Sequence, residues 1–177
     1  EKRAKRFKEL FEILKEKAKA FVQDEAGDFL VLKRSGTTKH RPFESDLVGG
    51  KVDKTDSSVL EAMYREGLEE IGLFLQNPIF LRTVSQEKQT KKQLVTSETS
   101  LFQATVPGIR PELVLSDEHD GLLWLPGTEL VLLEDLPERY RQVAVEMLVK
   151  DVVEPSQLDS FSAPESLVRF GRTIGQT

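Results

Sequence analysis

The sequence of 177 residues contains no cysteine and no long apolar run. Without cysteine the chain cannot form disulfides, thiolate zinc sites or iron–sulfur clusters, and it cannot use a cysteine nucleophile. A membrane-spanning helix needs about 18 consecutive apolar residues, and no such run is present. These absences agree with a cytoplasmic protein of about one domain, long enough to bury a core without disulfides or structural metal.

Acidic side chains outnumber basic ones by 30 to 25, and the two kinds are unevenly distributed. Residues 1–20 carry eight Lys/Arg against four Glu, so the rest of the chain holds 17 basic and 26 acidic side chains. An acidic body binds nucleic acid poorly, and we expect no specific nucleic-acid partner and no membrane association. The excess is expected if some carboxylates gather to hold divalent cations.

The basic N-terminal segment predicts a helix over residues 2–17. Its apolar side chains recur at helical spacing, namely Phe7, Leu10, Phe11 and Leu14. We expect this helix to pack on the body or on a second subunit, which makes it a candidate element of a homodimer. A basic helix on a membrane surface or on nucleic acid is the alternative, which the four Glu disfavour.

The remaining segments predict a mixture of strands and helices. Apolar and β-branched runs predict strands at 18–22, 29–33, 47–48, 79–85, 94–106 and 122–125, with turns at 24–28 and 86–93. Helical spacing predicts helices ending at residue 71 and spanning 138–150, followed by a tail with one helical turn near 165–170. This order indicates an α/β (α+β) fold, in which a mixed β-sheet is sandwiched between helices.

The first of these helices concentrates carboxylates on one face. Ser58 and Glu61 have the spacing of a capping box at its start, and Gly72 marks its end. At 3.6 residues per turn, Glu66, Glu69 and Glu70 share one face, opposite an apolar one. Like charges so close repel one another, and divalent cations would relieve that repulsion.

A solvated acidic face is the simpler explanation of three such carboxylates. It does not explain the preceding glycine pair Gly49-Gly50, the arginine directly before the first Glu, or the glycine at the helix exit. The combination therefore favours a metal–phosphate site.

The whole segment resembles the Nudix box, which reads Gly, five residues, Glu, seven residues, then Arg-Glu-apolar-any-Glu-Glu-any-Gly-apolar. The matching positions are Gly50, Arg65, Glu66, Glu69, Glu70, Gly72 and Leu73. Asp56 replaces the first Glu, and eight residues rather than seven separate it from Arg65. Gly67 replaces the apolar residue, which lowers helix stability by about 1 kcal/mol relative to Ala and indicates close packing against a neighbour.

The resemblance divides the chain into an N-terminal helix at 1–17, a Nudix domain at 18–152 and a C-terminal tail at 153–177. It implies a hydrolase that uses Mg²⁺ or Mn²⁺ to cleave the pyrophosphate linkage of a nucleoside diphosphate joined to another group X, such as a nucleotide sugar or ADP-ribose. The metal ligands implied are Glu66, Glu69, Glu70 and the carbonyl of Gly49, with Arg65 orienting the glutamates by ion pairing. Bound cations would neutralise the pyrophosphate and lower the pKa of the attacking water.

The box does not settle which carboxylate accepts the proton of that water. A later stretch, from Asp117 to Pro126, resembles the Glu-His…Trp segment found downstream in many Nudix proteins. We expect Glu118 to be an extra metal ligand or the catalytic base, with Glu98 as its rival. His119 is interpreted as a hydrogen-bonding residue of the loop and Trp124 as a core residue.

Substrate contacts are expected at three further positions. Arg34 ends a predicted strand where Nudix proteins often present a cation to phosphate, and Lys51 follows the glycine pair. Either is equally well explained as a surface charge. Phe43 is a candidate to stack on a nucleobase, although packing alone would also explain a phenylalanine in a loop.

Two other functions compete with hydrolysis. Isopentenyl diphosphate isomerases share the fold and a related box but resemble enzymes with an active-site cysteine, which this chain lacks. A non-catalytic module that senses nucleotides is the second alternative. The complete set of Glu66, Glu69 and Glu70 disfavours it, because loss of those glutamates is its usual sign.

Overall fold

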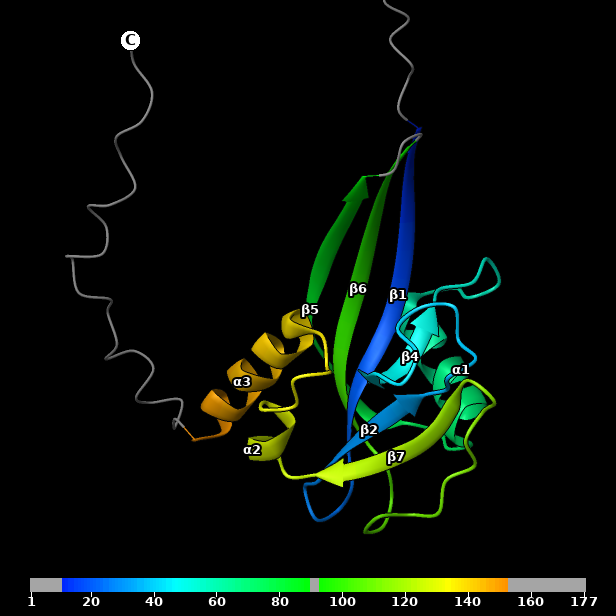
Figure 1. Ribbon diagram of the computed structural model, residues 1–177. Coiled ribbons are helices and arrows are strands. Elements are labelled where there is room, and N and C mark those ends of the chain that lie inside the picture. Colours follow the sequence, from blue (N-terminus) through cyan, green and yellow to red (C-terminus); the bar gives the residue numbers. More distant parts are fainter. Residues whose placement is uncertain (1–10, 90–92, 153–177) are drawn as a thin grey trace, which may run out of the picture.

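The computed structural model describes residues 11–89 and 93–152, which form one mixed sheet with helices on both faces (Figure 1). The seven strands are β1 (Phe11–Gln23), β2 (Phe29–Arg34), β3 (Ser45–Asp46), β4 (Val48–Lys51), β5 (Gln76–Gln89), β6 (Gln93–Thr105) and β7 (His119–Leu125). The helices are α1 (Val59–Ile71), α2 (Gly127–Leu130) and α3 (Glu138–Val152). No helix within these ranges has both the length and the apolar character that a membrane crossing needs.

The sheet is organised around β1. Its strand order is β3-β2-β1-β6-β5, with β4 paired to β1 and β7 paired to β2. Strand β1 runs parallel to β6 and antiparallel to β4, in a register that sets Lys19 opposite Gly49. The predicted strands 18–22 and 29–33 are both present, but they pair with each other only at Gln23 and Phe29. The rest of β2 pairs with β3 and β7 instead.

The predicted helix over residues 2–17 is wrong for the part that the structure describes. Residues from Phe11 onward form β1, which pairs with β6 from Phe11↔Gln93 to Gln23↔Thr105. The helical spacing of a few apolar side chains is a weak signal, and a full strand pairing outweighs it. Residues 1–10 lie outside the described residues, as does the predicted helical turn near 165–170.

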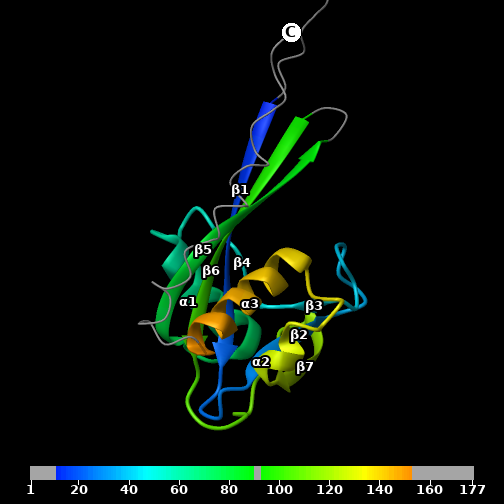
Figure 2. The same ribbon diagram turned by 90° about the vertical axis from the view of Figure 1, so that its left-hand side faces the viewer.

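Two apolar clusters fill the space on either face of the sheet. One packs β1, β2 and β6 against α1, and the other packs the opposite face of the same strands against α2 and α3. Strand β1 supplies both by alternation, with Ala18, Ala20 and Val22 in the first cluster and Phe21 in the second. Figure 2 shows α3 crossing the face of the sheet that is turned away from α1. The predicted sandwich is therefore confirmed.

Helix α1 begins and ends where its sequence signals predict. The Ser58 side chain accepts a hydrogen bond from the Glu61 N–H at 3.1 Å, as an N-cap does, and Gly72 closes the helix with a φ of 71°. The carboxylate of Glu61 accepts hydrogen bonds from the N–H and the hydroxyl of Ser57, not from the Ser58 N–H that a capping box would use. A Cβ on Gly67 would lie 2.9 Å from Leu75 Cγ, so this glycine does mark close packing.

The other differences concern element lengths. Strands β5 and β6 run from Gln76 to Gln89 and from Gln93 to Thr105, so they extend into the predicted turn at 86–93. Together with β1 they form a ribbon that extends past the helices (Figure 1). The short helix α2 was not predicted, because its four residues carry no helical periodicity.

Candidate metal and pyrophosphate site

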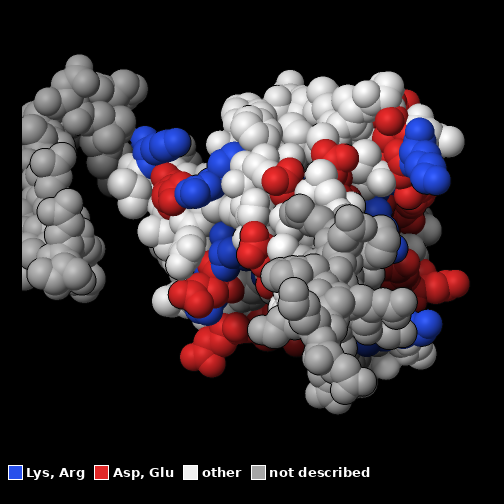
Figure 3. All heavy atoms as spheres, turned by 90° about the horizontal axis from the view of Figure 1, so that it is seen from above, with Lys and Arg blue, Asp and Glu red and all other residues white. Residues whose placement is uncertain are grey.

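A cavity of about 560 Å³ opens between β1, β4, the helix α1, the β2–β3 loop and the start of α3. It is lined by side chains of both signs, and Figure 3 shows acidic and basic groups side by side on the face seen from above. Of the predicted site residues, eight line the cavity: Arg34, Gly49, Lys51, Arg65, Glu66, Glu69, Glu70 and Glu118. Phe43 and Glu98 do not line it.

Glu70 is the buried carboxylate of the cavity. Its Oε2 accepts a hydrogen bond of 2.6 Å from the Gly49 N–H, which ties α1 to β4. Burial raises the pKa of Glu70 to about 8, although the ammonium of Lys19 and the bond from Gly49 act in the opposite direction. A buried carboxylate with so high a pKa is one that a proton or a cation must neutralise.

The glycine pair allows α1 and β4 to approach so closely. Gly49 has a φ of 124°, and a Cβ there would collide with the carbonyl oxygen of Ala18 on β1. A Cβ on Gly50 would lie 2.5 Å from Glu66 Oε1, so the carboxylate of Glu66 occupies the space that a side chain would need. Both inward carboxylates of α1 therefore converge on this pair of residues.

Arg65 holds the outer part of the acidic face. Its guanidinium donates to both oxygens of Asp56 at 3.0 Å, to Glu66 Oε1 at 3.1 Å and to Glu69 Oε2 at 2.9 Å. A further bond of 2.8 Å reaches the Lys51 carbonyl at the end of β4. Asp56, which departs from the box pattern, thus fixes the arginine that orients two glutamates.

Lys19 belongs to this site, and the sequence analysis missed it. Its ammonium donates to the carbonyl of Gly49 at 2.7 Å and of Leu47 at 2.9 Å, and lies 3.0 Å from Asp46 Oδ1. Burial lowers the pKa of Lys19, but the carboxylates of Asp46 and Glu70 outweigh it and raise the pKa above its ordinary value. The only signal in the sequence is a lysine inside the apolar run from Ala18 to Val22.

Arg34 lines the cavity but is already paired. Its Nη1 donates to Asp46 Oδ2 at 3.0 Å, and its Nε donates to the His40 carbonyl at 3.0 Å. Asp46 therefore has a cation on each oxygen. Burial raises the pKa of Asp46, but the charge and hydrogen bond of Lys19, the charge of Arg41 and the Leu47 N–H together hold it below the usual value of 3.8.

Of the two candidates for the catalytic base, only Glu118 lines the cavity. It lies at the entrance to β7. Glu98 pairs with Glu16, and this register places it on the face that β1 turns toward α1, whereas Lys17 and Lys19 point to the cavity. Strand parity therefore favours Glu118.

His119, Trp124 and Phe43 do not line the cavity. The His119 ring is buried, with Nδ1 3.4 Å from Ser116 Oγ and Nε2 3.9 Å from Glu70 Oε1. Trp124 packs against the cluster under α1. Phe43 is 72% exposed and lies over Gly36, and its stacking on a nucleobase stays a prediction.

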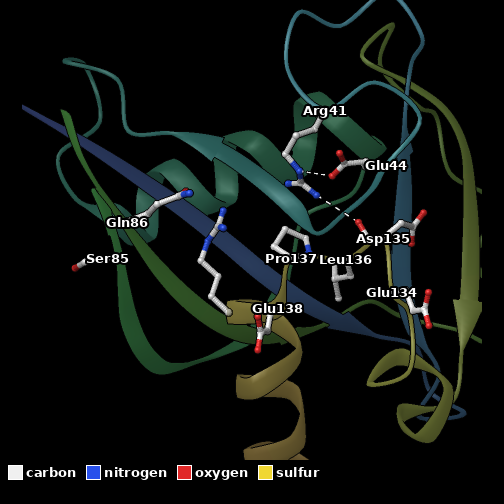
Figure 4. Close-up of a pocket in the computed structure, with 10 residues that line it drawn as sticks. Arg41, Glu44, Ser85, Gln86, Glu134, Asp135, Leu136, Pro137 and Glu138 are labelled. Carbon is white, nitrogen blue, oxygen red and sulfur yellow. Dashed lines mark hydrogen bonds and ion pairs between the residues drawn. The ribbon is translucent and has the colours of Figure 1, made fainter. Parts of the chain in front are cut away.

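A second cavity of about 680 Å³ adjoins the first and shares Arg41, Gln86 and Arg139 with it. In Figure 4, Arg41 reaches from the β2–β3 loop toward Glu44 and Asp135, with which it forms hydrogen bonds. The rim on the side of α3 is acidic, because Glu134 and Glu138 also line it.

The donors of the first cavity fit a hard divalent cation. Glu66 and Glu70 offer carboxylate oxygens one helical turn apart, and Glu118 lies in the same cavity. Within the described residues, no three acidic or histidine side chains already have the spacing of a metal cluster. Arg65 and the Gly49 N–H instead hold the glutamates.

Comparisons with known proteins agree with the motif and the fold. The family model of the NUDIX domain matches residues 14–147, which is most of the chain. The MutT protein from Methanosarcina mazei Go1 is similar in structure, with 25% identity and a TM-score of 0.65 over 80% of this chain and 98% of that one. A sequence search among curated proteins finds no match.

Two more distant structures show the fold alone. Escherichia coli dihydroneopterin triphosphate pyrophosphohydrolase is 20% identical, with a TM-score of 0.62 over 77% of this chain and 98% of that one. The NUDIX domain of Shewanella oneidensis NrtR, complexed with ADP ribose, is 17% identical, with a TM-score of 0.57 over 78% and 89%. From the box, the fold and the family match together, the chain belongs to the Nudix family and is an enzyme of the Nudix pyrophosphohydrolase type.

Proposed function

We propose that this enzyme uses Mg²⁺ or Mn²⁺ to hydrolyse the pyrophosphate linkage of a nucleoside diphosphate joined to another group X, such as a nucleotide sugar or ADP-ribose. The observation that carries the proposal is the convergence of Glu66 and Glu70 on the Gly49-Gly50 backbone, inside a cavity that basic side chains also line. A bound divalent cation would neutralise the pyrophosphate and lower the pKa of the attacking water.

The three glutamates of α1 are proposed to have different roles in binding the cation. Glu66 and Glu70 are the inner donors, since both are largely buried and lie against the glycine pair. Glu69 is 59% exposed and bound to Arg65, so it is an outer donor that also keeps Arg65 in place. The carbonyl of Gly49 is a separate case, because Lys19 already donates to it.

Glu118 is proposed as the residue that accepts the proton of the attacking water. It lines the cavity with Glu66 and Glu70, whereas its rival Glu98 does not. A general base must come within hydrogen-bond reach of the proton that it takes, directly or through one water. Substitution of Glu118 by Gln should therefore reduce turnover more than it weakens cation binding.

The phosphates of the substrate are proposed to contact cations on the open side of the cavity. Lys51 and Arg139 line it, from the end of β4 and the start of α3. Arg139 lies over the Tyr140 ring, 4.6 Å from its centre, which orients the guanidinium. The predicted contact from Arg34 is weaker, because Arg34 is engaged with Asp46.

A panel of nucleoside diphosphate derivatives tests this function. Each compound is incubated with Mg²⁺, with Mn²⁺ or with EDTA, and products are read as phosphate after coupling to a phosphatase. We expect at least one compound to be cleaved in the presence of Mg²⁺ or Mn²⁺, and no compound to be cleaved in EDTA. Tight binding without turnover across the panel would instead identify a non-catalytic nucleotide-binding module.

A further inference from the structure

We propose that the Lys19 ammonium is a built-in cation of the metal site, which occupies the Gly49 carbonyl in place of a metal ion. The divalent cation then binds through Glu66 and Glu70 without this oxygen, an inference that rests on the metal site of the proposed function. One of the five ligands expected from the Nudix resemblance, the Gly49 carbonyl, therefore binds a lysine in this chain instead of the metal ion.

The hydrogen bonds of Lys19 leave its ammonium no free donor. A lysine has three N–H groups. The Nζ atom has three acceptors, at 2.7 Å from the Gly49 carbonyl, 2.9 Å from the Leu47 carbonyl and 3.0 Å from Asp46 Oδ1. Its side chain is only 7% exposed, so water does not compete for these positions. Such an ammonium is a fixed charge rather than a mobile surface group.

The strand register explains how a lysine reaches this position. Lys19 on β1 lies directly opposite Gly49 on β4. Because Gly49 lacks a Cβ, the two backbones come so close that an added Cβ would lie 2.8 Å from Lys19 Cα. The lysine side chain extends along β4 from there and returns its ammonium to the carbonyls on either side of Val48.

The charge of Lys19 acts on Glu70 as well as on Asp46. Asp46 has a second cation, because Arg34 Nη1 lies 3.0 Å from its other oxygen. Lys19 is therefore not needed merely to pair Asp46, and its field also favours the ionised form of Glu70. The Lys19 Nζ lies 2.7 Å from the Gly49 carbonyl oxygen. A divalent cation bound to the same oxygen would therefore be repelled by the ammonium.

Binding of Mn²⁺ without any substrate tests the inference, with electron paramagnetic resonance as the readout. The variant Lys19→Met removes the ammonium but keeps an unbranched side chain only one atom shorter, and Asp46 remains paired with Arg34. Lys17→Met is the matched control, because Lys17 lies on the same face of β1 and lines the same cavity. We expect Lys19→Met to bind Mn²⁺ at least tenfold more tightly, or to gain one ion, and Lys17→Met to change less than threefold.

Equal effects of the two variants, weaker binding by Lys19→Met, or no Mn²⁺ binding by either protein would overturn the inference. Nuclear magnetic resonance of the lysine ¹⁵Nζ groups in the unmodified protein gives an independent test if a variant fails to fold. The protected Lys19 signal should persist at saturating Mg²⁺, and its loss would show that the metal displaces the ammonium. Since neither readout needs turnover, failure of the substrate panel would leave this inference intact.

Discussion

Substitution of Gly50 by alanine should separate catalysis from folding. An ordinary contact between a carbon and an oxygen atom is about 3.3 Å. The added Cβ would lie 2.5 Å from Glu66 Oε1 and 2.6 Å from Oε2, so the carboxylate has to move by about 0.8 Å. That exceeds the tolerance of about 0.2 Å in metal–ligand distances, and a misplacement near 1 Å is associated with about a 100-fold loss of rate.

The cost to folding should be small, because the displaced atoms are the end of a flexible side chain. Gly50 has no positive φ, and no backbone atom is among the nearest contacts of the added Cβ. We expect a melting temperature within about 4 °C of the unmodified protein, turnover reduced about 100-fold and Mn²⁺ binding weakened in parallel. Thermal unfolding, phosphate release and Mn²⁺ titration measure the three quantities.

Two other glycines supply the controls. Alanine at Gly121 on β7 would place its Cβ 3.9 Å from Lys33 Cβ, an ordinary contact, and should leave turnover and stability unchanged. Alanine at Gly49, which has a φ of 124°, should destabilise the fold by at least about 1–3 kcal/mol. Normal turnover in Gly50→Ala, or unfolding as severe as in Gly49→Ala, would refute the reasoning.

Four further predictions concern the site and the core. Arg65→Lys should lower turnover at least about tenfold without loss of helix content by circular dichroism, because a lysine cannot form the fork that contacts Asp56, Glu66 and Glu69; unchanged turnover would contradict it. The raised pKa of Glu70, about 8, should make Mn²⁺ affinity rise with pH and level off above pH 8, as measured by calorimetry. In EDTA the same shift should lower the free energy of unfolding as pH rises from the ordinary value of 4.5 to 8, since the unfolded carboxyl releases its proton first; a flat profile would contradict the burial effect. Leu30→Ala, at a fully buried position, should lower the free energy of unfolding by about 2–5 kcal/mol in urea titrations, and a loss below about 1 kcal/mol would be inconsistent with the core described.

Features set by neighbouring residues could be predicted from the sequence. The helix α1 starts at its Ser58 cap and ends at Gly72, because both signals act through bonds to residues three or four positions away. The spacing of Glu66 and Glu70 likewise follows from helical geometry alone. Gly67 is similar, since an unfavourable residue inside a helix indicated packing that the contact with Leu75 then explained.

Features set by distant pairing could not be predicted. Whether residues 11–17 form a helix or a strand is decided by β6, which lies some 80 positions further along the chain. The role of Lys19 depends on Gly49 and Leu47, 30 and 28 positions away. The choice between Glu98 and Glu118 depends on which face of the sheet Glu98 occupies. That face is set by how β6 pairs with β1, because a shift of one residue in the pairing moves every side chain of the strand to the other face.

The central claim is that Glu70 holds a divalent cation for hydrolysis at phosphorus, and Glu70→Gln tests it most directly. An amide is a far weaker ligand of a hard cation than a carboxylate of nearly the same shape. Phosphate release is compared in Mg²⁺ for the two proteins, on a compound that the unmodified enzyme cleaves, after circular dichroism has shown that both are folded. Turnover should be abolished in Glu70→Gln, whereas retention of more than about a tenth of the unmodified rate would show that Glu70 does not hold the cation.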